Sequence, residues 1–292
     1  MKGFAQRNPL AVTLYFLAVS GIAMFTLHPV ITLLSLCGAL LLFLVRNGTK
    51  EGKSHLYFLA LFLLLSLLNP LISHRGETVL FVLNHNPVTL EALLYGICAG
   101  ANLLSVLYWL RSFSQIMTSD KLLYVFGKFS PKLSLVLSMS IRYVSLFRQQ
   151  AAKIAGAQKA LGLYRENTLI DRFLGGLRIF SVLLTWALEN GIITADSMAA
   201  RGYGCGKRTS YAIFRFSRED ALLLSVTLLL LLLTCVGMIT GALDFSFYPA
   251  VSAAPCSGIS VGSLVSYGIL AFLPVIFEAK EAILWKYSLS KI

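Results

Sequence analysis

Residues 221–243 read ALLLSVTLLLLLLTCVGMITGAL and contain no Asp, Glu, Lys or Arg. A bilayer core needs about 20 apolar residues in one helix, so this stretch predicts a membrane-spanning helix. Residues 92–110 form a second uncharged stretch, and residues 8–45 form one long enough for two spans joined near His28-Pro29. The 292-residue chain is 57% hydrophobic and 13% charged, with a mean hydropathy of +0.76, which indicates an integral membrane protein.

We predict an all-α integral membrane protein with six spanning helices. The predicted spans are residues 11–27, 30–45, 56–73, 88–110, 221–241 and 261–277. On this map 24 of the 25 Lys and Arg residues lie on one side of the bilayer, and only Arg75 lies on the other. The positive-inside bias therefore predicts a multi-pass protein of the cell membrane with both termini in the cytoplasm. It also accounts for the net charge of +12 without a nucleic-acid partner. The amino end lacks the pattern of a cleavable signal.

Local sequence predicts two features of the spans. Asn69-Pro70 in the third span and Pro274 in the sixth are expected to bend their helices. Residues 245–258 contain two prolines with several Ser and Ala, which predicts a loop on the outer side, either simple or partly re-entrant.

The cysteines and histidines predict neither a disulfide framework nor a metal site. The five cysteines are odd in number and scattered, which favours a role as small apolar filler. The four histidines lie near predicted segment ends with no ligand spacing between them. We therefore expect no cofactor or metal in this chain. These residues are Cys37, Cys98, Cys205, Cys235, Cys256, His28, His55, His74 and His85.

Residues 111–218 form a basic segment between the fourth and fifth predicted spans. They hold sixteen basic and five acidic residues, a net charge of +11. The uncharged stretches in this segment are too short to cross a bilayer, yet residues 122–137 are too apolar for a solvated loop. We expect an amphipathic helical domain against the cytoplasmic face, which divides the chain into residues 1–110, 111–218 and 219–292.

Two long helices with matching ends are predicted in this domain. Ser130-Pro131 has the pattern of an N-cap followed by proline, and nothing breaks that helix before Gly162. Asn167 and the capping-box spacing of residues 168–171 start a second helix, which stops at Gly202. The matching ends are Ala160-Leu161-Gly162 and Ala200-Arg201-Gly202.

Small residues recur every fourth position near both ends. Such ridges let helix backbones approach closely, which predicts a crossing there, although alanine is also simply common in helices. A crossed pair would present two helix carboxyl ends, where the macrodipole favours a cation such as Arg201. An arginine on a rigid scaffold suits a carboxylate-lined groove on a partner. The ridges are Ala152, Gly156 and Ala160 on the first helix, and Gly191, Ala195 and Ala199 on the second.

These helix ends resemble the signature of a known family, the transmembrane T component of energy-coupling factor (ECF) transporters. Two coupling helices in that family each end in Ala-Arg-Gly, and residues 195–204, ADSMAARGYG, hold an intact copy. Residues 157–162, AQKALG, are similar to the family's Ala-Gln-x-Ala-Arg-Gly, with Leu161 replacing arginine. Residues 141–145, IRYVS, resemble its Arg-aromatic-aliphatic-Pro with serine in place of proline. The resemblance is close over about residues 118–209.

The resemblance implies a non-catalytic subunit of an ATP-driven importer of vitamins or transition metals. It implies two ABC ATPase subunits, which bind the ATP, and a small substrate-binding membrane subunit as partners. Because Leu161 lacks a charge, we expect the second helix to carry more of the docking; Lys159 is on the wrong face of its helix, whereas Arg165 could swing in. The implied ATPase-docking residues are Ala160, Leu161, Gly162, Ala200, Arg201 and Gly202.

Three other functions fit the sequence less well. Residues 202–209, GYGCGKRT, look like a phosphate-binding loop, but arginines stand where that motif needs Gly and Ser or Thr. Residues 150–156, QAAKIAG, approach the Glu-Ala-Ala-x-x-x-Gly of ordinary ABC importer permeases, which is the main alternative. An intramembrane enzyme would need ionisable groups within the spans, and only Glu91 and Glu278, both near predicted interfaces, are candidates.

Overall fold

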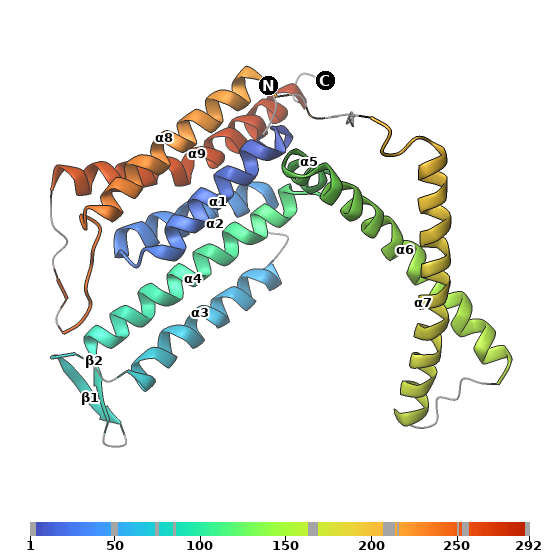
Figure 1. The fold of residues 1–292 in the computed structure, drawn as a ribbon. Coiled ribbons are helices and arrows are strands. Elements are labelled where there is room, and N and C mark those ends of the chain that lie inside the picture. The colour runs from blue at the N-terminus through green and yellow to red at the C-terminus, as the bar shows by residue number, and fades with distance from the viewer. Residues whose placement is uncertain are drawn as a thin grey trace. The chain divides into compact units, whose positions relative to one another are not determined.

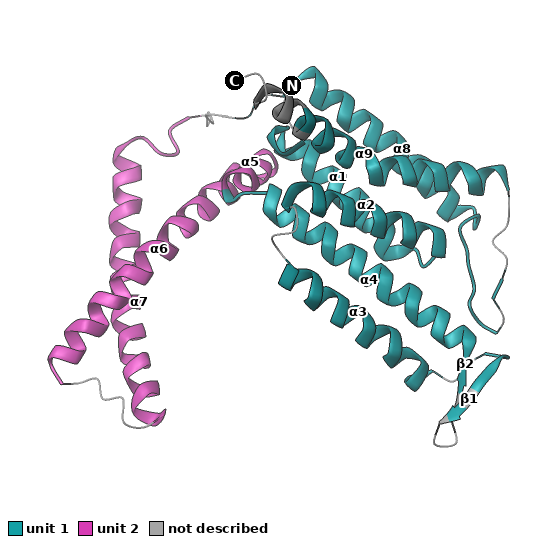
Figure 2. Cartoon of the chain, turned by 180° about the vertical axis from the view of Figure 1, so that it is seen from behind, with its two compact units in different colours: residues 1–119, 214–292 teal, residues 120–213 magenta. Residues whose placement is uncertain are grey.

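The computed structural model describes residues 4–47, 52–73, 76–83, 86–162, 169–206, 214, 216–249, 251–252 and 257–289. The chain forms two compact units, which Figure 2 shows in different colours. Unit 1 comprises residues 1–119 and 214–292, and unit 2 comprises residues 120–213. Unit 2 lies within the basic segment 111–218, and the predicted all-α class is confirmed by the long helices of both units.

Over its described residues, unit 1 is a bundle of six long helices, arranged as Figure 1 shows. Helix α4 packs against α1, α2 and α3, and α9 joins α2 to α8. Helix α3 packs chiefly on α4, so much of its surface is left for lipid or a partner. The elements are η1 (Phe4–Gln6), α1 (Pro9–Phe25), α2 (Pro29–Asn47), α3 (Gly52–Ile72), α4 (Leu90–Ile116), α8 (Arg218–Ile239) and α9 (Gly258–Leu289).

The centre of unit 1 is a cluster of aromatic rings with a few hydrogen-bonded polar groups. The rings of Tyr15 and Phe16 lie edge-to-face with Trp109, with centroids 6.3 and 5.9 Å away. The buried Trp109 Nε1 donates to Ser35 Oγ at 3.1 Å, and Ser35 in turn donates to Ser105 at 3.2 Å. These three buried polar groups from α2 and α4 are thus paired with one another, as a medium without water favours.

Helix length and composition confirm a multi-pass membrane protein and refine the predicted spans. In the described part of the chain, the helices long and apolar enough to cross a bilayer are α2, α3, α4, α7 (Leu169–Ala200), α8 and α9. Five of them correspond to predicted spans. Helix α1, the first predicted span, has 17 residues and a length of about 25 Å, at the lower limit for a span.

Helix α7 corrects the expectation that nothing between residues 111 and 218 could cross a membrane. Its charges are widely spaced, because Arg178 and Glu189 bracket ten uncharged residues, and its mean hydropathy therefore reaches 1.3. None of the ten residues between Arg178 and Glu189 is buried by other described parts of the chain. Helix α7 therefore has a large apolar surface that another molecule or the bilayer must cover.

A β-hairpin corrects the predicted start of the fourth span at Val88. Strand β1 (Val79–Leu83) pairs antiparallel with β2 (Asn86–Thr89), and α4 starts only at Leu90. The sequence VLFVL favours a strand, and the Thr89 side chain caps α4 by accepting from the Ala92 N–H at 3.3 Å. The Glu91 carboxylate accepts from the Thr78 hydroxyl at 2.7 Å, so its role here is to fasten the hairpin.

The structure locates the prolines, the loop and most of the cysteines that the sequence singled out in unit 1. Pro70 and Pro274 lie inside α3 and α9, and both helices continue past them. The predicted loop between α8 and α9 is present, and its Phe247 and Tyr248 pack on Tyr95 of α4 with centroids 5.5 and 5.6 Å away. His74, His85 and Cys256 lie outside the described residues, and the other four cysteines are free thiols.

Unit 2 consists of α5 (Ser119–Phe129), α6 (Pro131–Ala160) and α7. Ser130 caps α6 by accepting from the Leu133 N–H at 3.5 Å, which confirms the predicted start of this helix. Helices α6 and α7 cross each other (Figure 1). The predicted second N-cap lies outside the described residues, as do Arg165, Asn167 and Thr168.

Candidate functional site

The two long helices of unit 2 end in the same way. Helix α6 stops at Gly162 with φ of +69°, and α7 stops at Gly202 with φ of +79°, both in the left-handed region that glycine tolerates. At the end of α7, the Gly202 N–H donates to Ala199 O at 2.9 Å and the Tyr203 N–H donates to Met198 O at 3.0 Å. These two bonds form a Schellman motif, so the predicted helix ends are confirmed.

Leu161 and Arg201 occupy equivalent positions in these ends. Each directly precedes the left-handed glycine of its helix and closes the last turn through its backbone N–H, to Ala157 O at 3.1 Å and to Ser197 O at 3.2 Å. Both side chains are exposed, that of Leu161 to 73%. Within the described ranges Arg201 makes no ion pair. The two ends thus present one cation and one apolar group on similar backbones.

Aromatic and hydroxyl side chains hold α6 and α7 together. The Tyr143 hydroxyl lies 3.1 Å from Thr194 Oγ1, and the Phe147 ring meets the Trp186 ring edge-to-face with centroids 5.9 Å apart. Tyr143 also stacks on Phe147 at 5.5 Å. Tyr143 belongs to the IRYVS motif noted in the sequence, where it serves the crossing. Trp186 and Thr194 were not singled out, although large rings commonly dominate a contact by the area they bury.

On α6, these ring and hydroxyl contacts lie on a different face from the predicted small-residue ridge. Ala152 is nine residues from Tyr143, which is about 180° around the helix at 3.6 residues per turn. A Cβ added at Gly156 or Gly191 would meet no atom within 4 Å. The ridge residues all remain exposed: Ala152, Gly156, Ala160, Gly191, Ala195 and Ala199.

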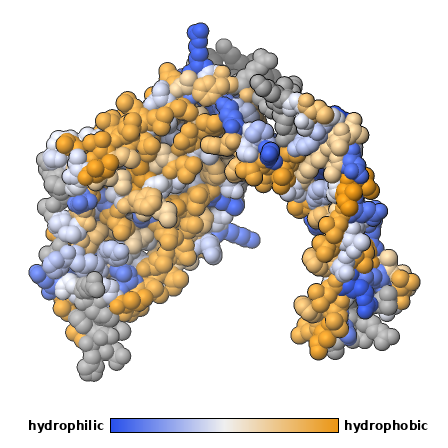
Figure 3. Space-filling view, viewed as in Figure 1, coloured by the Kyte–Doolittle hydropathy of each residue, from blue (hydrophilic) through white to orange (hydrophobic). Residues whose placement is uncertain are grey.

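The ridge of α7 continues an uncovered apolar face. At about 100° per residue, Gly191 and Ala195 lie on the same side of the helix as a row of large exposed side chains. This row comprises Leu169, Phe173, Leu177, Phe180, Leu184 and Leu188. In Figure 3, hydrophobic residues cover most of the visible face of unit 1, whereas hydrophobic and hydrophilic residues alternate along unit 2. An apolar face that narrows into small residues suits close contact with another helix.

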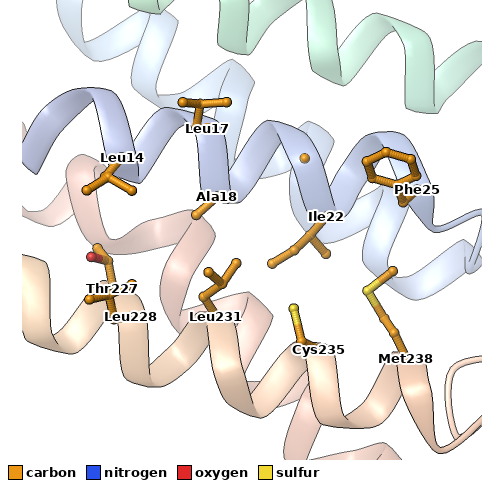
Figure 4. Close-up of a pocket in the computed structure, with 11 residues that line it drawn as sticks. Leu14, Leu17, Ala18, Ile22, Phe25, Thr227, Leu228, Leu231, Cys235 and Met238 are labelled. Atoms are coloured by element: carbon orange, nitrogen blue, oxygen red, sulfur yellow. The ribbon is translucent and has the colours of Figure 1, made fainter. Parts of the chain in front are cut away.

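Unit 1 contains an apolar cavity of about 320 Å³ between α1 and α8 (Figure 4). Its only polar side-chain groups are the hydroxyl of Thr227 and the thiol of Cys235. Such a lining offers no charge or general base for chemistry. Over the described parts of the chain, no cluster of three His, Cys, Asp or Glu residues could hold a metal ion. The lining residues are Leu14, Leu17, Ala18, Gly21, Ile22, Phe25, Thr227, Leu228, Leu231, Cys235 and Met238.

Comparison with known proteins finds relatives of the kind that the sequence resembles. No protein-family model matches the chain. The chain is similar to the "energy-coupling factor transporter transmembrane protein EcfT" of Lactobacillus helveticus, with 31% identity over 101 residues, and to that of Lacticaseibacillus paracasei, with 33% over 91 residues. The matched segments cover 34% and 30% of this chain, and 36% and 34% of the relatives.

The protein of the same name from Streptococcus equi is 30% identical over 101 residues. The matches thus span about a third of each relative's length. The resemblance to the ECF transmembrane component is confirmed over this part of the chain.

Proposed function

We propose that the chain is the transmembrane coupling (T) subunit of an ECF-type ABC importer. The observation that carries the proposal is the pair of similarly built, exposed helix ends at Leu161 and Arg201. Similarity to proteins named EcfT over a third of the chain supports it independently. In this role the chain has no catalytic activity and transmits conformational change between partners.

Two ABC ATPase subunits dock on these helix ends and bind the ATP. Residues 200–202 offer a guanidinium at a helix carboxyl end, where the macrodipole favours a cation and an acidic groove can receive it. Residues 160–162 offer the exposed Leu161 to the other ATPase subunit. The aromatic contacts between α6 and α7 keep the two ends at a fixed separation, so closure of the ATPase pair moves α6 and α7 together.

A small substrate-binding membrane subunit packs against the uncovered apolar helices and delivers a vitamin or a transition metal. Unit 2 and both termini are cytoplasmic in this arrangement, as the distribution of Lys and Arg supports. The exposed apolar face of α7 lies against this subunit or the membrane surface. Either contact covers the apolar side chains of α7 without requiring the helix to cross the bilayer.

The ordinary permease alternative lacks a matching element. Its motif would place residues 150–156 at a loop next to a short coupling helix. These residues instead lie in the interior of α6, an unbroken helix of 30 residues. The geometry therefore favours long coupling helices that dock through their ends.

Affinity purification of the tagged chain in mild detergent tests the proposal. We expect two ATPase subunits and one further small membrane protein to co-purify. The chain alone, freed of them, should hydrolyse no ATP above background. Hydrolysis by the isolated chain, or recovery of the chain without any ATPase, would contradict a coupling role.

A further inference from the structure

The amino-terminal segment Phe4–Asn8, here called the amino-terminal clasp, binds several helices of unit 1. The ring of Phe4 is fully buried and lies edge-to-face with Tyr15 and Phe16 of α1, with centroids 5.3 and 6.1 Å away. Because Phe4 is in the aromatic core, the residues that follow it are held at one end of the bundle. The clasp is therefore a packed part of unit 1.

Arg7 of the clasp is a buried cation with partners on two other helices. Its guanidinium lies 3.0 Å from Glu219 Oε2 and 4.0 Å from Asp220 Oδ1, both in the first turn of α8. It also lies over the ring of Phe277 of α9, at 5.1 Å from the centroid. Only 8% of the Arg7 side chain is exposed. A cation so placed attracts both helices toward the start of α1.

Asp220 links the clasp to the capping of α8. Its Oδ1 accepts from the Asn8 N–H at 3.2 Å, while its Oδ2 accepts from the Ser217 hydroxyl at 2.7 Å and from the Ser217 N–H at 3.0 Å. The Ser217 side chain completes a capping box by accepting from the Asp220 N–H at 3.3 Å. Because the carboxylate is buried, unwinding the first turn of α8 would break the clasp and the cap together.

A second ion pair extends the fastening to α2. Arg46 at the end of α2 lies 3.6 Å from Glu278 of α9, and the Ala5 backbone hydrogen-bonds to the same carboxylate. The clasp therefore contacts α8 and α9 directly, and α2 through Glu278. All these contacts lie at one end of the bundle, at the start of α8.

This end is where the chain returns from unit 2. Unit 2 ends at residue 213, and α8 begins only five residues later, at Arg218. We infer that the amino-terminal clasp, through Arg7, is the anchor that makes α8 move with α1 and α9 when unit 2 is displaced, instead of unwinding at its first turn. The inference rests on the proposed coupling role, in which the ATPases supply the displacement.

Limited trypsin digestion of the purified complex with its ATPases tests the anchor. The probe is cleavage after Arg218 in the first turn of α8, normalised to the amount of intact chain and measured with Mg-ATP or with ATP and EDTA. In the unaltered chain, cleavage after Arg218 should be slow and independent of ATP hydrolysis. In Arg7→Gln it should be about tenfold faster, because Asp220 loses its buried counter-ion, and Mg-ATP should accelerate it further.

Two further variants keep the test decisive if Arg7→Gln folds poorly. Arg7→Lys retains the charge and should restore part of the protection. Phe277→Leu removes the ring beneath the Arg7 guanidinium, leaves the Arg218-Glu219 bond unchanged, and should give an intermediate increase while the capping box remains. Arg46→Gln is the matched control, since the Arg46 ion pair does not include α8, and its cleavage after Arg218 should resemble that of the unaltered chain.

The possible results separate the two claims. Equal cleavage in Arg7→Gln and the unaltered chain would show that the clasp does not hold α8. Cleavage in Arg7→Gln that is faster but equal with Mg-ATP and with EDTA would show that the clasp stabilises α8 without resisting a displacement driven by ATP. This result would also overturn the inference. Recovery of the unaltered chain without ATPases would instead refute the proposed function on which the inference rests.

Discussion

The helices of the two units approach one another in different ways. In unit 1, a Cβ at Gly38 of α2 would lie 2.9 Å from the Ala271 carbonyl oxygen of α9, so the two backbones nearly touch. In unit 2, a Cβ at Gly156 or Gly191 would meet open space, and α6 and α7 are held by aromatic rings instead. Gly38 thus permits close helix contact in unit 1, whereas Gly156 and Gly191 lie on an uncovered surface of unit 2.

The difference follows from the medium around each unit. Lipid is as apolar as a leucine side chain, so helices in a bilayer gain little by burying large apolar groups and associate through close backbone approach. Helices in water gain most from burying large rings. Unit 1 combines both kinds of contact, whereas the contacts between α6 and α7 are of the second kind. This difference supports the proposed place of unit 2 outside the bilayer and leaves its small-residue ridges available to partners.

Replacing one tryptophan in each unit should give the largest difference in stability. Trp109→Ala removes a fully buried ring and its bond to Ser35, and should lower the free energy of unfolding by about 3 to 5 kcal/mol. Trp186→Ala removes a half-buried ring and should lower it by about 1 to 2 kcal/mol. Denaturant titration of the purified chain in detergent measures both values. Equal losses would show that the two units are packed alike.

Adding one methyl group should change stability in opposite directions in the two units. Gly38→Ala forces α2 away from the α9 backbone and should destabilise the chain by about 1 to 3 kcal/mol. Gly156→Ala has room and gains helix propensity, so it should stabilise α6 by up to about 1 kcal/mol. The same titration measures both variants. Destabilisation by Gly156→Ala would indicate that this ridge is covered within the chain.

The smallest expected effect is the pairwise energy of the crossing in unit 2. A double-mutant cycle of Tyr143→Phe and Thr194→Val should give a coupling of about 0.5 to 1.5 kcal/mol, the usual contribution of one hydrogen bond. Val144→Ala, at a neighbouring residue that is 69% exposed, should show no coupling to Thr194→Val. Coupling at Val144 instead of Tyr143 would place the crossing about 100° further around α6.

Local sequence signals predicted the parts of the fold that depend on neighbouring residues. Uncharged runs located five of the spans, and Ser130, Gly162 and Gly202 set the helix boundaries through caps that involve residues within one turn. The predicted start of the fourth span was wrong because residues 86–89 pair with another strand instead of extending the helix. Hydropathy alone could not distinguish these outcomes at Val88.

Features that depend on distant residues were not predictable from one sequence. The crossing residues depend on which faces of α6 and α7 meet, and small-residue spacing did not indicate the face of α6 that carries Tyr143. The amino-terminal clasp joins Asn8 to Asp220, which are 212 positions apart, and no local motif marks that pair. A site was suggested only where local sequence resembled a family signature, at the two helix ends, residues 160–162 and 200–202.

In the proposed function, the Arg201 cation at the end of α7 docks an ATPase subunit. This docking is tested most directly by the amount of ATPase retained on the immobilised chain at two salt concentrations. Arg201→Ala should weaken retention about thirtyfold or more, because truncating one member of a desolvated charge pair costs about 2 to 5 kcal/mol. Arg201→Lys should recover only part of it, since an ammonium lacks the planar fork of the guanidinium.

The equivalent position on α6 supplies the internal comparison for this measurement. Leu161→Ala should weaken retention much less than Arg201→Ala, and Leu161→Arg should leave it equal or tighter. Equal losses for Leu161→Ala and Arg201→Ala would mean that both helix ends dock through apolar contact. Full retention of the ATPase by Arg201→Ala at both salt concentrations would contradict docking through Arg201.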